Sequence, residues 1–277
     1  MVATIDGPRI APKSTPRQLV VFLHGYGADG NDLIELGRQW RAFMPDALFV
    51  APHAPELCAM APSGRQWFSL TMRDPAERWT GVNKARPTLD AFLDAELTKL
   101  GLDESALALV GFSQGTMMAL HTGLRRPRAP ACILGYSGTL VGPDHLAEAT
   151  ARDKDGAPPP ILLAHGDSDD VIPLDALFES TSALAKANLP CQWHISFGVG
   201  HGIDEGGLMH GGLFLARNFG MRIKAAYRRP GRRGDSRAPR SGRSLYANPP
   251  RAFAKDFRRF ERRTAERDQI SRRARAN

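Results

Sequence analysis

The stretch Gly111-Phe112-Ser113-Gln114-Gly115 decides how the fold is interpreted, because of what stands on either side of it. The apolar run LALV at 107–110 leads into it with the composition of a buried strand, and a helix-forming stretch follows it. A serine at such a strand-to-helix turn adopts a strained backbone conformation and presents its hydroxyl at the carboxyl edge of a sheet. A glycine-flanked turn with a helix-capping serine is the alternative. The context favours Ser113 as a nucleophile.

The segment from Gln18 to about Gly220 alternates short apolar runs with longer amphipathic stretches. This alternation predicts an α/β fold, with a mostly parallel sheet and helices on both faces. The predicted strands are 19–23, 47–50, 106–111, 131–136, 161–164 and 192–197, and the predicted helices are 31–43, 84–100, 114–124, 174–187 and 207–219. Proline and glycine breakers make 55–82 an irregular segment.

The charge divides the chain into two parts. Residues 222–277 hold 19 Lys and Arg against 5 Asp and Glu, which leaves 18 against 24 in residues 1–221. The basic part is also poor in apolar residues, too poor to offset the entropy lost on ordering. We therefore expect a folded domain over 1–224 and a mostly disordered tail over 225–277. An Arg-rich tail can attract nucleic acid or an anionic membrane, but we prefer a solvated extension without function.

The remaining bulk features indicate a cytoplasmic protein. There is no apolar run long enough to span a bilayer, and residues 1–10 lack the apolar core of a signal peptide. The three cysteines form no CxxC pair, which fits a reducing compartment. Cys132 and Cys191 lie in predicted strands, so we expect buried, unreactive thiols.

A serine nucleophile needs a base to take its proton and an acid to orient that base. Of the eight histidines, His201 alone follows the last predicted strand with a glycine on either side. His210 is the nearest rival, His53 could approach the site, and His24 and His165 precede glycines at strand ends, where turn-building roles are expected. His201 is therefore the predicted base.

The acid is expected in the loop after the strand 161–164, because the chain order on such a sheet is serine, acid, histidine. That loop contains Asp167, Asp169 and Asp170. Their spacing does not separate them. The two that do not orient the histidine are expected to bind backbone N–H groups of the turn.

Six motifs in the same order resemble the phospholipase/carboxylesterase family of α/β-hydrolases, over about 19–219. They are LHGYGADG at 23–30, FVAPHAP at 49–55, GRQWFSL at 64–70, GFSQGT at 111–116, HGDSDDVIP at 165–173 and GHGI at 200–203. The resemblance implies an α/β-hydrolase fold. It places the acid at Asp169, beside Ser113 and His201.

The resemblance also implies the rest of the site. The backbone N–H groups of Tyr26 and Gln114 would form the oxyanion hole. Trp67, Phe68 and Ile172 are the candidate substrate-binding residues, with a core contact as the alternative for the aromatic pair. Two positions depart from the family pattern: Gly202 stands where many members have Glu, and Tyr26 where Leu is common.

The implied activity is that of a serine esterase that cleaves carboxylic esters through an acyl-enzyme on Ser113. Short-to-medium acyl esters are the expected substrates, and a lysophospholipase or an acyl-protein thioesterase is the alternative. The partner is thus a small-molecule ester or thioester, and no metal or organic cofactor is implied.

Overall fold

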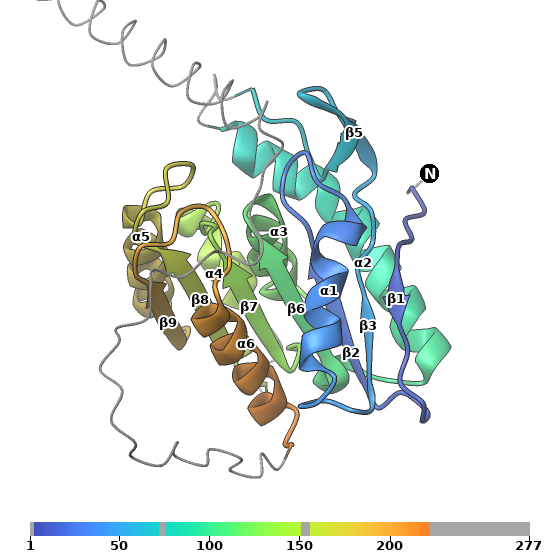
Figure 1. The fold of residues 1–277 in the computed structure, drawn as a ribbon. Coiled ribbons are helices and arrows are strands. Elements are labelled where there is room, and N and C mark those ends of the chain that lie inside the picture. The colour runs from blue at the N-terminus through green and yellow to red at the C-terminus, as the bar shows by residue number, and fades with distance from the viewer. Residues whose placement is uncertain (1–2, 72–75, 151–155, 222–277) are drawn as a thin grey trace, which may run out of the picture.

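A seven-stranded sheet crosses the part of the chain that the computed structural model describes, which is residues 3–71, 76–150 and 156–221 (Figure 1). The strand order is β1-β3-β2-β6-β7-β8-β9. Within this sheet, as far as the structure describes it, only β1 is antiparallel to its neighbour. The strands are β1 Arg9–Ile10, β2 Gln18–Leu23, β3 Ala47–Val50, β6 Leu107–Phe112, β7 Cys132–Tyr136, β8 Ile161–Gly166 and β9 Cys191–Ser196. The predicted α/β class is confirmed.

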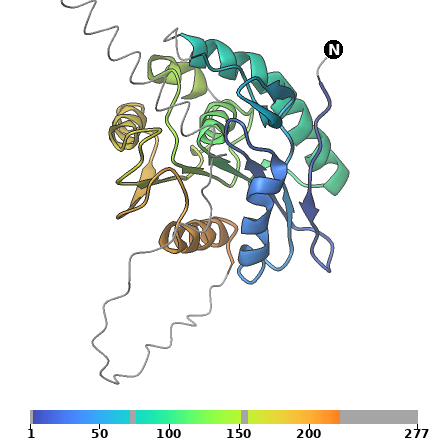
Figure 2. The ribbon, with the colours of Figure 1, turned by 45° about the horizontal axis from the view of Figure 1, so that its top comes forward.

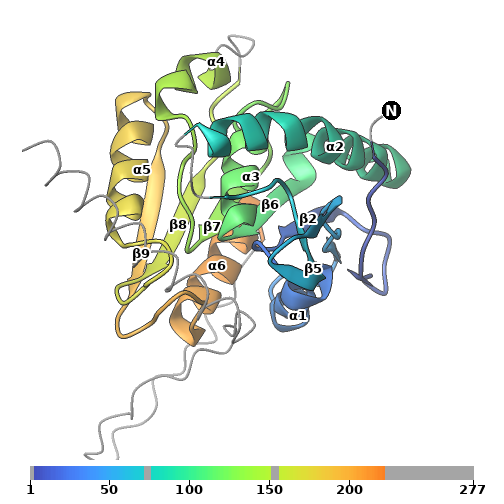
Figure 3. The same ribbon diagram turned by 90° about the horizontal axis from the view of Figure 1, so that it is seen from above.

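Helices cover both faces of the sheet (Figures 2 and 3). On one face lie α1 and α6, and on the other lie α2, α3 and α5. Their bounds are α1 Gly30–Trp40, α2 Glu77–Leu100, α3 Gln114–Gly123, α5 Asp175–Lys186 and α6 Glu205–Asn218; the short helices are η1 Glu104–Ala106, η2 Pro143–His145 and α4 Leu146–Thr150.

The strand β2 shows why its sequence is an unbroken apolar run. Leu19, Val21 and Leu23 belong to the core cluster under α2 and α3, whereas Val20 and Phe22 belong to the cluster under α1 and α6. Side chains alternate between the two faces of a strand, and here both faces are covered by helices. All five are fully buried, and each such side chain stabilises the fold by about 1.5–3 kcal/mol.

The segment 55–82, predicted to be irregular, contains a β-hairpin and the start of a helix. β4 Glu56–Cys58 pairs with β5 Ala61–Gln66 in a separate two-stranded sheet. α2 begins at Glu77, seven residues before its predicted start. Gly81, taken as a breaker, is a packing glycine inside α2, because a Cβ there would lie 2.3 Å from the Phe68 ring. β1, η1, η2 and α4 were not predicted either.

The other elements begin and end within three residues of their predicted bounds. Cys132 is buried, as predicted, whereas Cys191 is only half-buried. Burial raises the pKa of both thiols, to about 12 for Cys191. Within the described ranges, no helix combines the length and the apolar character needed to cross a membrane. The predicted tail, 225–277, lies outside the described residues.

Candidate active site

The carboxyl ends of four parallel strands meet at one edge of the sheet, and each is followed by a predicted site residue. Tyr26 follows β2, Ser113 follows β6, Asp169 follows β8 and His201 follows β9. β2 and β6 are neighbours in the sheet, as are β8 and β9, with β7 between the two pairs. The topology therefore brings together residues that lie up to 175 positions apart in the chain.

The turn at Ser113 has the strained geometry that the motif predicts. Ser113 has φ +55° and ψ −115°, and α3 begins at the next residue. A Cβ at Gly111 would lie 2.4 Å from the carbonyl carbon of Gly115, and one at Gly115 would lie 1.8 Å from the oxygen of Leu23. Both distances are far below van der Waals contact, so this sharp turn needs glycine on each side of the serine.

The Asp169 carboxylate and the His201 ring form a close pair. Nδ1 of His201 lies 2.8 Å from Oδ2 of Asp169 and 3.1 Å from its Oδ1. Oδ1 also accepts hydrogen bonds from the backbone N–H groups of Val171 and Ile172, at 2.9 Å each. Four contacts thus hold one buried carboxylate in place.

The electrostatics of this pair define its protonation state. Burial raises the pKa of Asp169, but hydrogen bonds from His165 and His201 outweigh it, and the pKa lies well below its usual value. Because the ionised carboxylate only accepts, Nδ1 of His201 carries the proton and Nε2 keeps its lone pair. The His201 ring lies 4.9 Å from the Phe112 ring, next to Ser113. This tautomer can act as a base.

The rival residues have other contacts. His210 stacks on His194 at 4.3 Å between ring centroids, on α6 and β9. Asp167 accepts a hydrogen bond from the N–H of Gly198 at 2.7 Å, in the turn after β9, and another from the Ser168 hydroxyl at 2.9 Å, in its own turn. Asp170 is exposed. Asp169 supplies the carboxylate that contacts Nδ1 of His201.

The turn after β2 lies beside the serine. A Cβ at Gly25 would lie 3.4 Å from Cβ of Ser113. The Tyr26 phenol hydrogen-bonds to the Cys58 thiol of β4, and burial together with this contact raises the pKa of Tyr26. The N–H of Gln114 belongs to the first turn of α3, where backbone N–H groups have no acceptor within the helix. Both predicted oxyanion donors are thus next to Ser113 in space or in sequence.

The profile of the Phospholipase/Carboxylesterase family matches residues 7–218. The chain belongs to this family. It is therefore a carboxylic ester hydrolase with the α/β-hydrolase fold. The resemblance drawn from six motifs is confirmed.

Several members of the family are similar over most of their length. The crystal structure of esterase PE8 is 42% identical, with a TM-score of 0.73, over 78% of this chain and 99% of that chain. Esterase YpfH of Escherichia coli (strain K12) is 29% identical over 196 residues, 70% of this chain and 80% of the relative. Acyl-protein thioesterase 1 of Saccharomyces cerevisiae is 31% identical over 181 residues, 61% of this chain and 78% of the relative.

The predicted substrate-binding side chains of this hydrolase are largely covered. Trp67 and Phe68 are each 1% exposed and Ile172 is 8% exposed, and all three belong to the core cluster under α2 and α3. The indole N–H of Trp67 donates to the carbonyl oxygen of His24 at 3.0 Å. The aromatic pair is therefore part of the core in this conformation, as the alternative interpretation of these two residues expected.

His165, for which a turn-building role was expected, contacts the predicted acid. Its Nε2 lies 2.7 Å from the carbonyl oxygen of Ile172 and 3.3 Å from Oδ2 of Asp169. The Nε2–H group of His165 is therefore placed between the Asp169 carboxylate and the backbone at Ile172. The available signal was its position four residues before Asp169, in the same loop motif.

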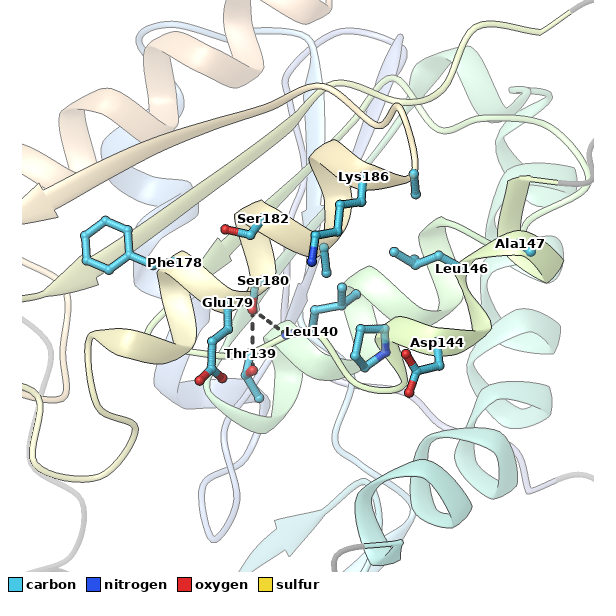
Figure 4. Close-up of a pocket in the computed structure, with 13 residues that line it drawn as sticks. Thr139, Leu140, Asp144, Leu146, Ala147, Phe178, Glu179, Ser180, Ser182 and Lys186 are labelled. Carbon is cyan, nitrogen blue, oxygen red and sulfur yellow. Dashed lines mark hydrogen bonds between the residues drawn. The ribbon is translucent and has the colours of Figure 1, made fainter.

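A groove of about 700 Å³ lies between η2–α4 and α5 (Figure 4). Leu140 and Leu146 form part of its apolar lining, and Asp144, Glu179 and Lys186 are the charged residues that line it. Neither the serine nor the Asp–His pair lines it. The groove is therefore separate from the predicted catalytic residues.

Proposed function

We propose that this chain is a serine esterase that uses Ser113 as nucleophile, His201 as base and Asp169 as the acid that orients the base. The contact of 2.8 Å between Asp169 and His201, at the sheet edge where Ser113 is presented, is the observation that carries the proposal. It supplies the orientation and charge that a catalytic histidine needs.

In the first half of the reaction, Nε2 of His201 takes the hydroxyl proton as Oγ of Ser113 attacks the ester carbonyl carbon. The carbonyl oxygen becomes an oxyanion, held by the N–H groups of Tyr26 and Gln114. The carbon–oxygen bond to the alcohol then breaks, and His201 gives its proton to the departing alcohol. The product is an acyl ester of Ser113.

In the second half, His201 takes a proton from water as the water oxygen attacks the acyl carbonyl. The same two N–H groups hold the second oxyanion. The bond to Oγ breaks, Ser113 regains the proton from His201, and the carboxylic acid leaves. The Asp169 carboxylate stays ionised throughout and stabilises the imidazolium form of His201.

Labelling with a fluorophosphonate probe tests the nucleophile. We expect the wild-type chain to be labelled on Ser113 and Ser113→Ala to remain unlabelled. Label that persists in Ser113→Ala, at the wild-type rate, would overturn the assignment.

We propose short-to-medium acyl esters as the substrates. The names of the relatives support an esterase, and the acyl-protein thioesterases among them supply the alternative of a long-chain lipid or thioester. The buried Trp67, Phe68 and Ile172 would form the wall behind the acyl group. A series of p-nitrophenyl esters from acetate to palmitate decides the matter, because maximal kcat/KM at long chains would favour the alternative.

The basic tail is the basis of an alternative of a different class, binding to nucleic acid or to an anionic membrane. We propose instead that it is dispensable for hydrolysis. A chain ending at Lys224 is expected to keep the kcat/KM of the full chain. Salt-sensitive binding to DNA or phosphatidylserine vesicles that disappears with the tail would support the binding role.

A further inference from the structure

The side chain of Gln114 makes two hydrogen bonds that its proposed role does not require. Its Oε1 accepts from the backbone N–H of Trp67 at 2.9 Å, and its Nε2 donates to the carbonyl oxygen of Phe68 at 2.8 Å. Gln114 is 1% exposed. A buried amide with both ends engaged fixes the segment it binds, because either partner left alone would be a buried unpaired polar group.

The segment that Gln114 holds is continuous with β5, and β5 holds one end of the turn that bears Tyr26. The N–H of Gly27 donates to the carbonyl oxygen of Arg65 at 2.9 Å, and the N–H of Arg65 donates to that of Ala28 at 2.7 Å. Arg65 lies two residues before Trp67. The last part of the turn is therefore tied to the hairpin by two backbone hydrogen bonds.

The other end of the turn is held through Trp67 and His24. The Trp67 indole donates to the carbonyl oxygen of His24. Because the N–H of Ala54 donates to Nε2 of His24 at 3.0 Å, Nδ1 carries the ring proton and donates to the carbonyl oxygen of Gly25 at 2.8 Å. Tyr26 thus lies between two hydrogen-bonded parts of the chain, and Arg65 and Trp67, which bind them, are two residues apart.

We propose that the Gln114 side chain is a positioning residue that couples the two oxyanion donors. Its own backbone N–H is one donor, and its amide fixes the segment that anchors the turn carrying the other, Tyr26. Oxyanion donors act when they lie 2.7–3.1 Å from the developing charge, so the distance between them matters as well as their presence. This inference rests on the proposed oxyanion hole.

A purely structural role for Gln114 would have different consequences. If the amide only filled space and satisfied backbone groups, its loss would reduce stability and leave kcat at the wild-type value in the protein that still folds. A positioning role lowers kcat with little change in KM, because the oxyanion exists only in the transition state.

Two variants separate these roles. Gln114→Met keeps the length of the side chain and removes both hydrogen bonds; we expect kcat to fall about 10-fold to 100-fold, less than the 10²–10³ typical of a lost donor. Gln114→Glu restores the amide pattern only when protonated, since the neutral acid can accept from Trp67 and donate to Phe68. Its kcat relative to wild type is expected to rise as the pH falls from 8 to 5.

For Gln114→Met, the ratio of its kcat to the wild-type kcat is expected to stay constant over the same pH range. Gln114→Glu at pH 5 and at pH 8 is one protein, so a folding defect cannot mimic the trend if circular dichroism is the same at both pH values. Tyr136→Phe is the matched control, because it removes one buried hydrogen bond, from the Tyr136 hydroxyl to the carbonyl oxygen of Gly207 at 3.0 Å, toward α6.

Three results would each overturn the inference. The first is a kcat of Gln114→Met within threefold of wild type, and the second is a kcat of Gln114→Glu, relative to wild type, that does not change between pH 8 and pH 5. The third is a loss of kcat in Tyr136→Phe as large as the loss in Gln114→Met. Failure of the proposed function is a separate observation. It would appear as a wild-type chain that is not labelled at Ser113 by a fluorophosphonate, whatever the Gln114 variants do.

Discussion

Replacing Ser113 by glycine is expected to stabilise the fold while abolishing activity. Ser113 has φ +55° and ψ −115°, a backbone conformation that residues with a Cβ rarely adopt. Holding such a residue there costs about 1–3 kcal/mol, a cost that glycine does not carry. Glycine also gives the unfolded chain more freedom, which offsets about 0.4–1 kcal/mol of the gain.

The expected net gain for Ser113→Gly over Ser113→Ala is therefore about 1–2 kcal/mol. Both variants lack the hydroxyl, and only alanine keeps the Cβ, so the difference between them isolates the backbone strain. For a domain of this size, 1 kcal/mol shifts Tm by about 2–4 °C. The measurement is thermal unfolding by circular dichroism, together with urea titration of both variants.

Asn188→Gly is a suitable control. Asn188 also has positive φ, +56°, just after the end of α5, but asparagine tolerates the left-handed region and little strain is available to release. We expect its free energy of unfolding to stay within about 0.5 kcal/mol of wild type, and its Tm therefore within about 2 °C. A Ser113→Gly chain no more stable than Ser113→Ala would refute the strain at the nucleophile.

Three further predictions concern the charged and buried groups. His165→Leu removes the N–H between Asp169 and its loop, and should lower the free energy of unfolding by about 1.5–3 kcal/mol in urea titrations and reduce kcat; an unchanged protein would contradict this. Burial lowers the pKa of His121 to about 3 and of His24 to about 4, so each favours folding above pH 6.5 and this contribution is lost as the pH falls toward those values. His121→Phe should therefore raise the free energy of unfolding at pH 5 by about 2 kcal/mol more than it does at pH 7.5. Equal effects at the two pH values would be inconsistent with a buried neutral ring. Asp169→Asn should lower kcat about 10³-fold to 10⁴-fold, whereas Asp170→Asn, in the same loop, should remain active within about threefold, a difference below 1 kcal/mol.

Much of the sheet could be predicted because burial on both faces leaves a local mark in the sequence. The run Leu19–Leu23 is apolar throughout, and such runs predicted the parallel strands to within three residues. The β4–β5 hairpin has no such continuous apolar run. It stands apart from the main sheet, and its Pro62 and Gly64 suggested a loop. Gly64 is instead needed for close approach, since a Cβ there would lie 2.0 Å from the oxygen of Gly27.

The candidate site divides in the same way. Ser113 and His201 were predicted from chain order and from glycines that any sharp turn requires. Asp169 needed family resemblance as well, because two more aspartates stand within two positions of it. The contacts of the Gln114 side chain depend on which residues the fold brings into reach, because Phe68 and Trp67 lie 46 and 47 positions away in the chain. Local patterns carry no record of such contacts.

Strand register explains why the proposed oxyanion hole forms where it does. Leu23 of β2 pairs in register with Gly111 of β6, so the chain leaves the two strands side by side, toward Tyr26 in one case and Ser113 in the other. The two turns can approach only because Gly115 lacks a Cβ, which would otherwise meet the oxygen of Leu23. The sheet therefore sets the distance between the donors coarsely. The β4–β5 hairpin binds the turn after β2, and the Gln114 amide links the turn after β6 to the segment that follows the hairpin. These contacts lie outside the main sheet, and they are the ones that can adjust the distance between the donors finely.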